Sequence, residues 1–198
     1  MNPRQVNFMR LLPRNFYAQD TVTVAKDLLG KILVRKINDK IVSGVIVETE
    51  AYKYKEDPAS HAFRGITERN RAMFEKIGSA YVYFTYGMHY CVNAVARDPD
   101  TKSGAVLIRS LVPLEGIDFM IKQRKTKQIS NLTSGPAKLT QALKITKEQY
   151  GVDLTKKSSL YIAEMRENHD HVIESRSRIG IKKATDKLWN FRIRYNEL

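Results

Sequence analysis

The first regular pattern of apolar positions along the chain has helical spacing. Within residues 21–29, four apolar side chains fall on one helical face: Val24, Ala25, Leu28 and Leu29. Gly30 follows them, and glycine readily takes the left-handed conformation that commonly ends a helix. The pattern therefore predicts a short helix over 21–29.

Strand patterns dominate several later segments. Residues 31–36 and 41–52 are rich in Ile and Val and flank the turn sequence Asn-Asp-Lys, so we expect them to pair. Residues 80–93, AYVYFTYGMHYCVN, alternate with period two on either side of Gly87 and predict a hairpin. Residues 104–114, GAVLIRSLVPL, predict a further strand, with its exit marked by a proline, Pro113.

Two further helices are predicted, one between these strands and one after the last of them. The first covers about 67–77, where Thr67 opens the segment and Gly78 ends it. The second covers 114–124, where the apolar residues form one helical face: Leu114, Ile117, Met120 and Ile121.

A last predicted helix begins in the sequence SGPAKLTQALKI, with Ser134 as its N-terminal cap. The exposed amide groups at such a start can bind a phosphate, which makes Ser134 and Gly135 candidate contacts for one. Plain capping is the alternative interpretation. Because no repeat, low-complexity tract or long linker divides the chain, we expect one domain over residues 1–198.

The charge of the chain indicates a polyanionic partner. The formal net charge is +13 and the pI is about 9.8. Two stretches are densely basic: KQRKTKQ at 122–128, and residues 176–194, where only Asp186 opposes seven lysines and arginines. Nucleic acid or an anionic membrane would each fit, although no long amphipathic helix with a basic face favours the membrane.

Several classes of protein are excluded by the same sequence. No apolar run of about 18 residues and no secretory signal occurs, so we expect an intracellular protein without a membrane span. The single cysteine, Cys91, excludes an internal disulfide and any four-cysteine metal site. His169 and His171 form an isolated H-D-H sequence that we interpret as a loop, so neither a metal nor a cofactor is predicted.

Charged residues at the ends of two apolar strands are candidates for chemistry. In VIVETEAY, alternation places Ile46, Glu48, Glu50 and Tyr52 on one face of the strand. A carboxylate there either reaches water or has a function, because a buried unpaired charge is costly. The spacing does not choose between the two glutamates. Arg109 ends the run AVLI in the same way and could hold a carboxylate, with a structural ion pair as the alternative.

The tip of the predicted hairpin carries an aromatic residue, Tyr86, beside Gly87, where turns are normally polar. Met88 and His89 follow and are candidate contacts for DNA. A basic surface with an aromatic wedge suggests a DNA duplex opened at one step, at a cost of a few kcal/mol. Stacking on aromatic rings contributes roughly 1–3 kcal/mol per base and could nearly balance that cost.

These segments together resemble a known family. VETEAY, then Asp57 with ASHAFRG, RNRAMF, YVYFTYGMHYCVN, VLIRSLVPLEG, SGPAKLTQAL and RIGI occur in the order seen in the alkyladenine (3-methyladenine) DNA glycosylases. The resemblance covers about residues 11–194. It implies an α+β fold: a single mixed domain around a curved, largely antiparallel sheet, with a protruding β-hairpin that inserts into DNA.

The resemblance also assigns site residues. Glu50 would be the general base, with Arg109 and the backbone carbonyl of Ile179 helping to hold the attacking water. Tyr86 would enter the minor groove and fill the space left by the flipped nucleotide. The remaining positions would bind the base: Tyr52 stacks on one side, His61 and Tyr83 lie on the other, and Asn93 disfavours guanine.

The implied activity is that of a monofunctional glycosylase in base excision repair. It would remove alkylated or deaminated purines from double-stranded DNA, with 3-methyladenine, 7-methylguanine, hypoxanthine and 1,N6-ethenoadenine as candidates, and leave an abasic site. No lysine occupies a motif position suited to attack C1′. We expect a monomer associated with the nucleoid in the cytoplasm. The alternative is a non-catalytic nucleic-acid-binding module.

The two ends of the chain depart from parts of the family. The short N-terminus predicts a minimal, bacterial-like form. The C-terminus ends in RIRYNEL rather than in a tail of the type G-N-P-x-V-S, so we expect a last strand that is shorter or differently capped.

Overall fold

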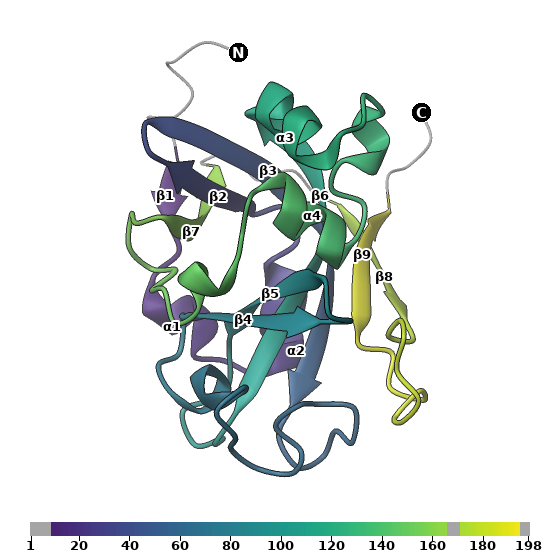
Figure 1. Ribbon diagram of the computed structural model, residues 1–198. Helices are drawn as coiled ribbons and strands as arrows, with labels where there is room; N and C mark the ends of the chain where they lie inside the picture. Colours follow the sequence, from purple (N-terminus) through teal and green to yellow (C-terminus); the bar gives the residue numbers. More distant parts are fainter. Residues whose placement is uncertain (1–8, 166–170, 195–198) are drawn as a thin grey trace.

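The computed structural model describes residues 9–165 and 171–194, and its main feature is one antiparallel sheet (Figure 1). The strands in this part of the chain are β1 (Met9–Leu11), β2 (Ile32–Ile37), β3 (Lys40–Lys53), β4 (Ala80–Thr85), β5 (His89–Val95), β6 (Gly104–Glu115), β7 (Leu160–Met165), β8 (Val172–Arg176) and β9 (Asn190–Arg194). Their order is β1-β7-β2-β3-β6-β5-β4, and β9 pairs with both β3 and β8. Every one of these pairings is antiparallel.

The long strand β3 changes partners along its length. On one edge, β2 pairs with its first part and β9 with residues 48–50. On the other edge, β6 pairs with it over most of its length, but the register shifts between Ile46 and Thr49. Such an irregularity changes the direction of nearby side chains. Glu48 and Glu50 therefore lie where β3, β6 and β9 meet.

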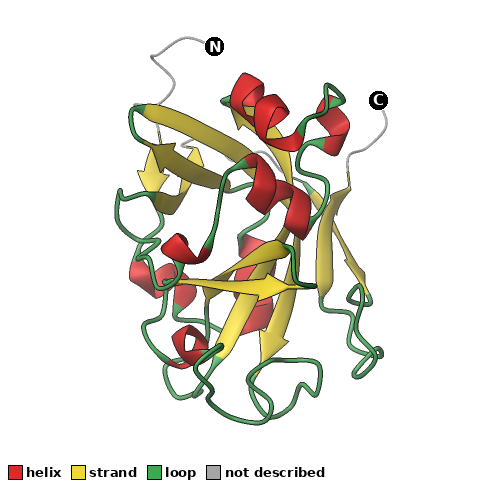
Figure 2. Cartoon of the chain, viewed as in Figure 1, coloured by secondary structure: helices red, strands yellow, loops and turns green. Residues whose placement is uncertain are grey.

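Short helices cover the sheet (Figure 2). The helical segments in the described residues are α1 (Arg14–Tyr17), α2 (Thr21–Asp27), α3 (Ile117–Arg124) and α4 (Pro136–Ala142), with 3₁₀ turns η2 (Arg71–Phe74), η3 (Ile129–Asn131) and η4 (Lys147–Gln149). Helix α2 packs on β3 and β6, and α4 packs on β5 and β6. Asp20 caps α2, because its side chain accepts from the amides of Val22 and Thr23. The main core lies between these helices and the sheet.

Most predicted elements are confirmed. The helix expected over 21–29 is α2, and Gly30 follows it with a φ of 79°. The strands expected over 31–36 and 41–52 are β2 and β3, which pair through the predicted turn. The hairpin around Gly87 is formed by β4 and β5. The largely antiparallel sheet in a mixed α+β domain is confirmed as well.

The helix expected over 67–77 is wrong. Only the four-residue turn η2 forms within this segment. Asn70 is buried there, and its side-chain amide donates to two carbonyl groups of the preceding loop while its oxygen accepts from the Thr67 amide. Side-chain bonds to the backbone of this kind compete with helix formation.

The boundary between β6 and α3 also differs from the prediction. Strand β6 continues through Pro113 to Glu115, with Leu114 as an extra residue opposite the Ser43–Gly44 step of β3. A bulge is a position where a strand tolerates proline, since a ladder hydrogen bond is absent there. Helix α3 consequently begins only at Ile117.

Ser134 is not the cap of α4, contrary to the prediction. The N-cap is Gly135, with no side-chain hydrogen bond to the helix, and Pro136 occupies the first turn. Proline is well suited to that position because its missing N–H needs no partner there. The Ser134 hydroxyl instead donates to Asn131 and accepts from Lys138.

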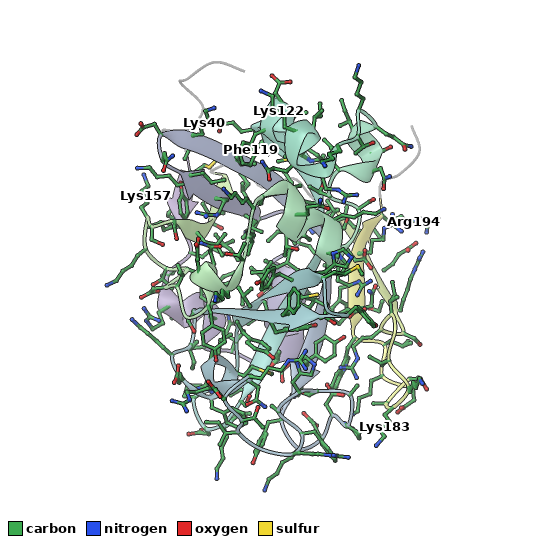
Figure 3. All side chains as sticks on the ribbon, viewed as in Figure 1. Lys40, Phe119, Lys122, Lys157, Lys183 and Arg194 are labelled. Atoms are coloured by element: carbon green, nitrogen blue, oxygen red, sulfur yellow. The ribbon has the colours of Figure 1, made fainter. Side chains whose placement is uncertain are left out.

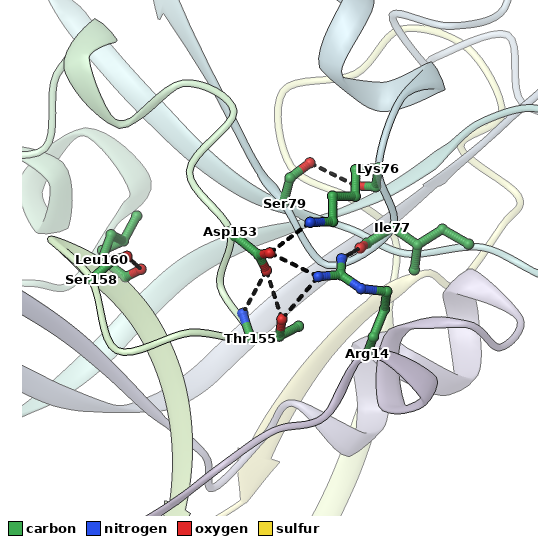
Figure 4. A network of polar contacts seen from close by, with 8 residues as sticks. All are labelled: Arg14, Lys76, Ile77, Ser79, Asp153, Thr155, Ser158 and Leu160. Carbon is green, nitrogen blue, oxygen red and sulfur yellow. Dashed lines mark hydrogen bonds and ion pairs between the residues drawn. The ribbon is translucent and has the colours of Figure 1, made fainter.

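An ion-pair network fixes α1 to the loops that flank β4 (Figure 4). Asp153 Oδ2 accepts from Arg14 Nη2 at 2.7 Å and from Lys76 Nζ at 2.8 Å, and Thr155 also donates to this carboxylate. Burial alone would raise the pKa of Asp153, but the hydrogen bonds from Lys76, Thr155 and Arg14 outweigh it and hold the pKa below its usual range. The charged carboxylate therefore anchors the base of the β4–β5 hairpin, beside the Ser79–Asp153 bridge.

Two features of the described residues concern membranes and metals. No helix in 9–165 or 171–194 is long and apolar enough to cross a membrane. Within the same ranges, no group of three or more His, Cys, Asp or Glu side chains could hold a metal ion. His169 of the H-D-H sequence lies outside the described residues.

Candidate active site

A cavity of about 520 Å³ is formed by β4, β5 and β6 together with the loops that follow β3 and β8. These two loops, 54–66 and 177–189, run at the same end of the sheet in Figure 1. The lining combines aromatic rings with cationic side chains: Tyr52, His61, Tyr81, Tyr83, Tyr86, Arg109, Lys182 and Lys183. The structure thus gathers most of the predicted site residues around one space.

The Glu50 carboxylate lies directly behind the wall of this cavity. It is fully buried and accepts four hydrogen bonds. Oε2 accepts from the Tyr52 hydroxyl at 2.7 Å and from Arg109 Nη1 at 3.2 Å. Oε1 accepts from the Ile179 amide at 2.7 Å and from Asn190 Nδ2 at 3.0 Å. Four protein donors thus surround a carboxylate that solvent does not reach.

Glu48 shares two of these partners, so both glutamates and Tyr52 occupy one site, as the alternation predicted. Its Oε1 accepts from Arg109 Nε at 3.1 Å and from Asn190 Nδ2 at 2.9 Å. Only Glu50 also contacts Tyr52 and Ile179, which line the cavity. Glu50 thus has three partners in the cavity lining and Glu48 has one, Arg109, while the assignment of Glu50 as the general base stays a prediction.

The ring of Tyr52 is held between Glu50 and a buried ion pair. Burial and the Glu50 charge raise the pKa of the Tyr52 phenol, so its hydroxyl keeps its proton and donates. The Arg178 guanidinium lies 4.6 Å from the centroid of the ring. Arg178 binds both oxygens of Asp57, at 2.6 and 2.7 Å, and donates to the Ala51 carbonyl at 2.9 Å.

The other predicted base-binding residues, from β4, β5 and the loop after β3, also line the cavity. His61 Nδ1 lies 2.9 Å from the Tyr81 hydroxyl, and its ring meets that of Tyr83 edge to face at 4.7 Å. Partial burial and then the nearby Arg69 charge lower the pKa of His61, which favours the neutral ring. Asn93 is buried and donates to the Tyr81 carbonyl at 2.9 Å, so its side chain is fixed.

The hairpin tip presents Tyr86 to solvent at the cavity rim. Its side chain is 84% exposed, and it belongs to the cavity lining. Tyr86 and Gly87 both have positive φ, at 51° and 66°, as a type I′ turn requires. A left-handed backbone is uncommon for an aromatic residue, and such conformations cluster at functional sites.

The four candidate DNA contacts lie beside the cavity rather than in its wall. Met88 is 69% exposed at the hairpin tip, and His89 begins β5. Ser134 and Gly135 directly precede Pro136, which belongs to the lining. A role for them in DNA binding stays a prediction.

The two basic stretches of the sequence lie far apart. Lys183 is at the cavity, whereas Lys122 of the KQRKTKQ stretch lies near the opposite end of the molecule (Figure 3). Within residues 176–194, Arg178 is buried and Arg176 is paired with Glu174. Of the seven basic residues in 176–194, Lys182 and Lys183 line the cavity.

Sequence reasoning missed three members of the site. Asn190 carried no signal, because it reaches both glutamates from β9, more than a hundred residues away. Asp57 and Arg178 occur in the motifs noted above, but without an assigned function; their pairing spans 121 positions. For Ile179, the structure gives an amide donor to Glu50, while the predicted role of its carbonyl stays a prediction.

The family of the chain follows from comparisons with known proteins. The sequence profile described as methylpurine-DNA glycosylase (MPG) matches residues 15–197. A protein of Carboxydothermus hydrogenoformans, provisionally named 3-methyladenine DNA glycosylase, is 49% identical over 94% of this chain and 97% of its own length. Similarly named proteins of Prosthecochloris aestuarii and Clostridium acetobutylicum are 48% and 43% identical, over 89% and 96% of this chain and 84% and 96% of their own lengths. The chain belongs to the methylpurine-DNA glycosylase family.

Membership of this family makes the protein a DNA glycosylase of DNA repair, with DNA as its substrate. It also favours an enzyme over the non-catalytic nucleic-acid-binding module that the sequence left open. The relatives named above come from bacteria.

Proposed function

We propose that the protein is a monofunctional glycosylase that turns a damaged purine out of duplex DNA and hydrolyses its N-glycosidic bond, leaving an abasic site. The observation that carries this proposal is the set of contacts that Glu50 makes with three residues of the cavity wall: Tyr52, Arg109 and Ile179. The candidate substrates are 3-methyladenine and 7-methylguanine, followed by hypoxanthine and 1,N6-ethenoadenine. We also propose that it acts as a monomer at the nucleoid in the cytoplasm, where bacterial DNA lies.

One carboxylate is sufficient for this chemistry when the base is alkylated. Breaking the bond develops positive charge on the sugar, which a nearby carboxylate stabilises while it takes a proton from the attacking water. Ordinary glycosidases need a second carboxyl group because the leaving oxygen must be protonated. An alkylated purine already carries positive charge and leaves as a neutral base. Neutral hypoxanthine, in contrast, requires a proton from solvent.

The attacking water has to take the place of one protein donor at Glu50. An ionised carboxylate offers about four acceptor positions, and four protein groups occupy those of Glu50. Tyr52 is the donor whose hydroxyl and ring both belong to the cavity side, so we propose that the water replaces this hydroxyl when the ring stacks on a bound base. Arg109 and the Ile179 backbone then hold the water.

The cavity rings supply the binding energy for the flipped base. Tyr52 stacks on one face, with His61 and Tyr83 on the other, at roughly 1–3 kcal/mol for a stacked base. A cationic purine gains further attraction to the ring faces. Asn93, which is buried and hydrogen-bonded to a carbonyl, is held where it would crowd the exocyclic amine of guanine; 7-methylguanine carries the same amine, so we expect its excision to be slower than that of 3-methyladenine.

Excision from defined duplexes tests the proposal. Each duplex contains one 3-methyladenine, 7-methylguanine, hypoxanthine or 1,N6-ethenoadenine, and an undamaged duplex is the control. We expect strand breaks at the lesion only after alkali, and no covalent complex after treatment with borohydride, although Lys182 and Lys183 line the cavity. Intact strands with every lesion refute the function; trapping by borohydride refutes the monofunctional mechanism alone.

Replacing Tyr86 by serine is expected to weaken lesion affinity and single-turnover excision by about tenfold, because the stacking of one ring is lost. The melting temperature should not change, since the side chain is 84% exposed. Tyr86→Phe retains the ring and serves as the matched control, with excision close to that of the unmodified protein. Unchanged affinity and excision in Tyr86→Ser would remove Tyr86 as the wedge.

A further inference from the structure

A second guanidinium lies against an aromatic wall of the cavity. Arg69, from the loop before η2, is 5.3 Å from the centroid of the Tyr83 ring. Its Nη2 donates to the Phe84 carbonyl at 3.0 Å, which fixes the group on β4. Arg69 is exposed and is not itself among the residues that line the cavity. Arg69 therefore adjoins the cavity only through the Tyr83 ring.

Arg69 differs from the other guanidinium groups of the site in its lack of a counterion. Arg178 is neutralised by Asp57, and Arg109 by Glu48 and Glu50. Among the described residues, no carboxylate lies within ion-pair distance of Arg69, whose hydrogen-bond partner is a carbonyl. Its charge also helps to lower the pKa of His61, after partial burial of that ring. The Arg69 guanidinium is thus a fixed positive charge next to the cavity wall, without a counterion in the described part of the chain.

We propose that Arg69 determines how the cavity discriminates between charged and neutral purines: its guanidinium opposes the binding of a cationic base and favours the departure of any base from the sugar. This inference rests on the proposed function of the same cavity. Arg69 touches neither the base nor the water, so it is a specificity-determining residue and not a catalytic one.

The two effects follow from where the charge lies before and during bond breaking. An alkylated purine is a cation when bound. When the C1′–N bond breaks, its electron pair goes to the base nitrogen, the base becomes neutral, and positive charge appears on the sugar instead. Repulsion from Arg69 weakens the bound state and is relieved as the base leaves. A neutral purine suffers no repulsion when bound, and Arg69 stabilises the negative charge that develops on it before solvent supplies the proton.

The variant Arg69→Gln separates the effect on affinity from the effect on excision rate when a cationic lesion is compared with a neutral one. Affinity is measured for duplexes with one 7-methylguanine or one hypoxanthine, in a Glu50→Gln background that prevents excision. Removing the charge should raise affinity for 7-methylguanine by on the order of fivefold, as expected for two charges separated by an aromatic ring, and leave affinity for hypoxanthine unchanged. With Glu50 present, the single-turnover rate at saturation should fall for both lesions by a similar factor.

Two control variants test whether the effect comes from the Arg69 charge beside the Tyr83 ring. Arg69→Lys keeps the charge and should keep the ratio of the two affinities near that of the unmodified protein. Arg71→Gln removes an equal charge from the exposed first residue of η2, two positions further along the chain, and should change both affinities equally. Equal changes in affinity for 7-methylguanine and hypoxanthine in Arg69→Gln would overturn the inference. If the unmodified protein excises neither lesion, the proposed function fails, while the affinity measurements still decide the role of Arg69.

Discussion

Replacing Glu50 by glutamine is expected to lower the single-turnover excision rate by about 10²- to 10⁴-fold, the usual contribution of a positioned general base. Glutamine has nearly the same shape, so the cavity and its rings stay in place. Affinity for lesion DNA should therefore survive. The measurement is alkali-dependent cleavage of a duplex with one 7-methylguanine, combined with a binding titration on the same duplex.

Glu48→Gln is the matched control for this prediction. Glu48 shares Arg109 and Asn190 with Glu50 but does not contact Tyr52 or Ile179. Its loss should reduce excision much less, because the carboxylate beside the cavity remains. Full activity of Glu50→Gln, or an equal loss in both variants, would exclude Glu50 as the base. Thermal unfolding of each variant checks that lost activity does not reflect lost folding.

The elements that could be predicted from sequence are those set by local patterns. Helix α2 and the β4–β5 hairpin each follow from apolar periodicity with a glycine at the turn, and neither depends on distant residues. The helix expected over 67–77 failed because buried Asn70 bonds the backbone of its own loop. Its effect depends on burial, which a local pattern does not contain. The start of α3 failed for a similar reason, since the bulge at Leu114 forms only when β6 pairs with β3.

The candidate site likewise has features that a local sequence pattern predicts and features that depend on distant contacts. Alternation placed Glu48, Glu50 and Tyr52 together, but it could not state which carboxylate has more contacts with the cavity lining. The loop after β8 makes this difference, because it brings the Ile179 amide to Glu50 at 2.7 Å. The sequence shows 176–194 as a densely basic stretch, whereas Arg178 within it is buried and pairs with Asp57 instead of adding to the exposed charge. Both outcomes depend on contacts between residues far apart in the sequence.

Replacing Asp57 by asparagine is expected to lower the free energy of unfolding by about 3–5 kcal/mol, because the Arg178 charge is then buried without its partner. Both side chains are fully buried. For a domain of this size, the melting temperature should fall on the order of 10 °C. Arg10→Gln is the control: its ion pair with Glu164 is exposed on the arginine side, and surface pairs contribute about 0–1 kcal/mol.

The double variant Asp57→Leu with Arg178→Met distinguishes the contribution of the ion pair to stability from its contribution to positioning the site residues. Replacing both charges by apolar groups of similar size should recover most of the lost stability, since no buried charge remains unpaired. Excision should stay low, because the Tyr52 ring loses the cation at 4.6 Å and residue 178 no longer anchors the loop that carries Ile179. Recovery of both stability and excision would mean that the ion pair has no function beyond folding. Recovery of stability without recovery of excision would show that the Asp57–Arg178 pair has a function beyond folding. That function is to position Tyr52 and the Ile179 amide beside Glu50.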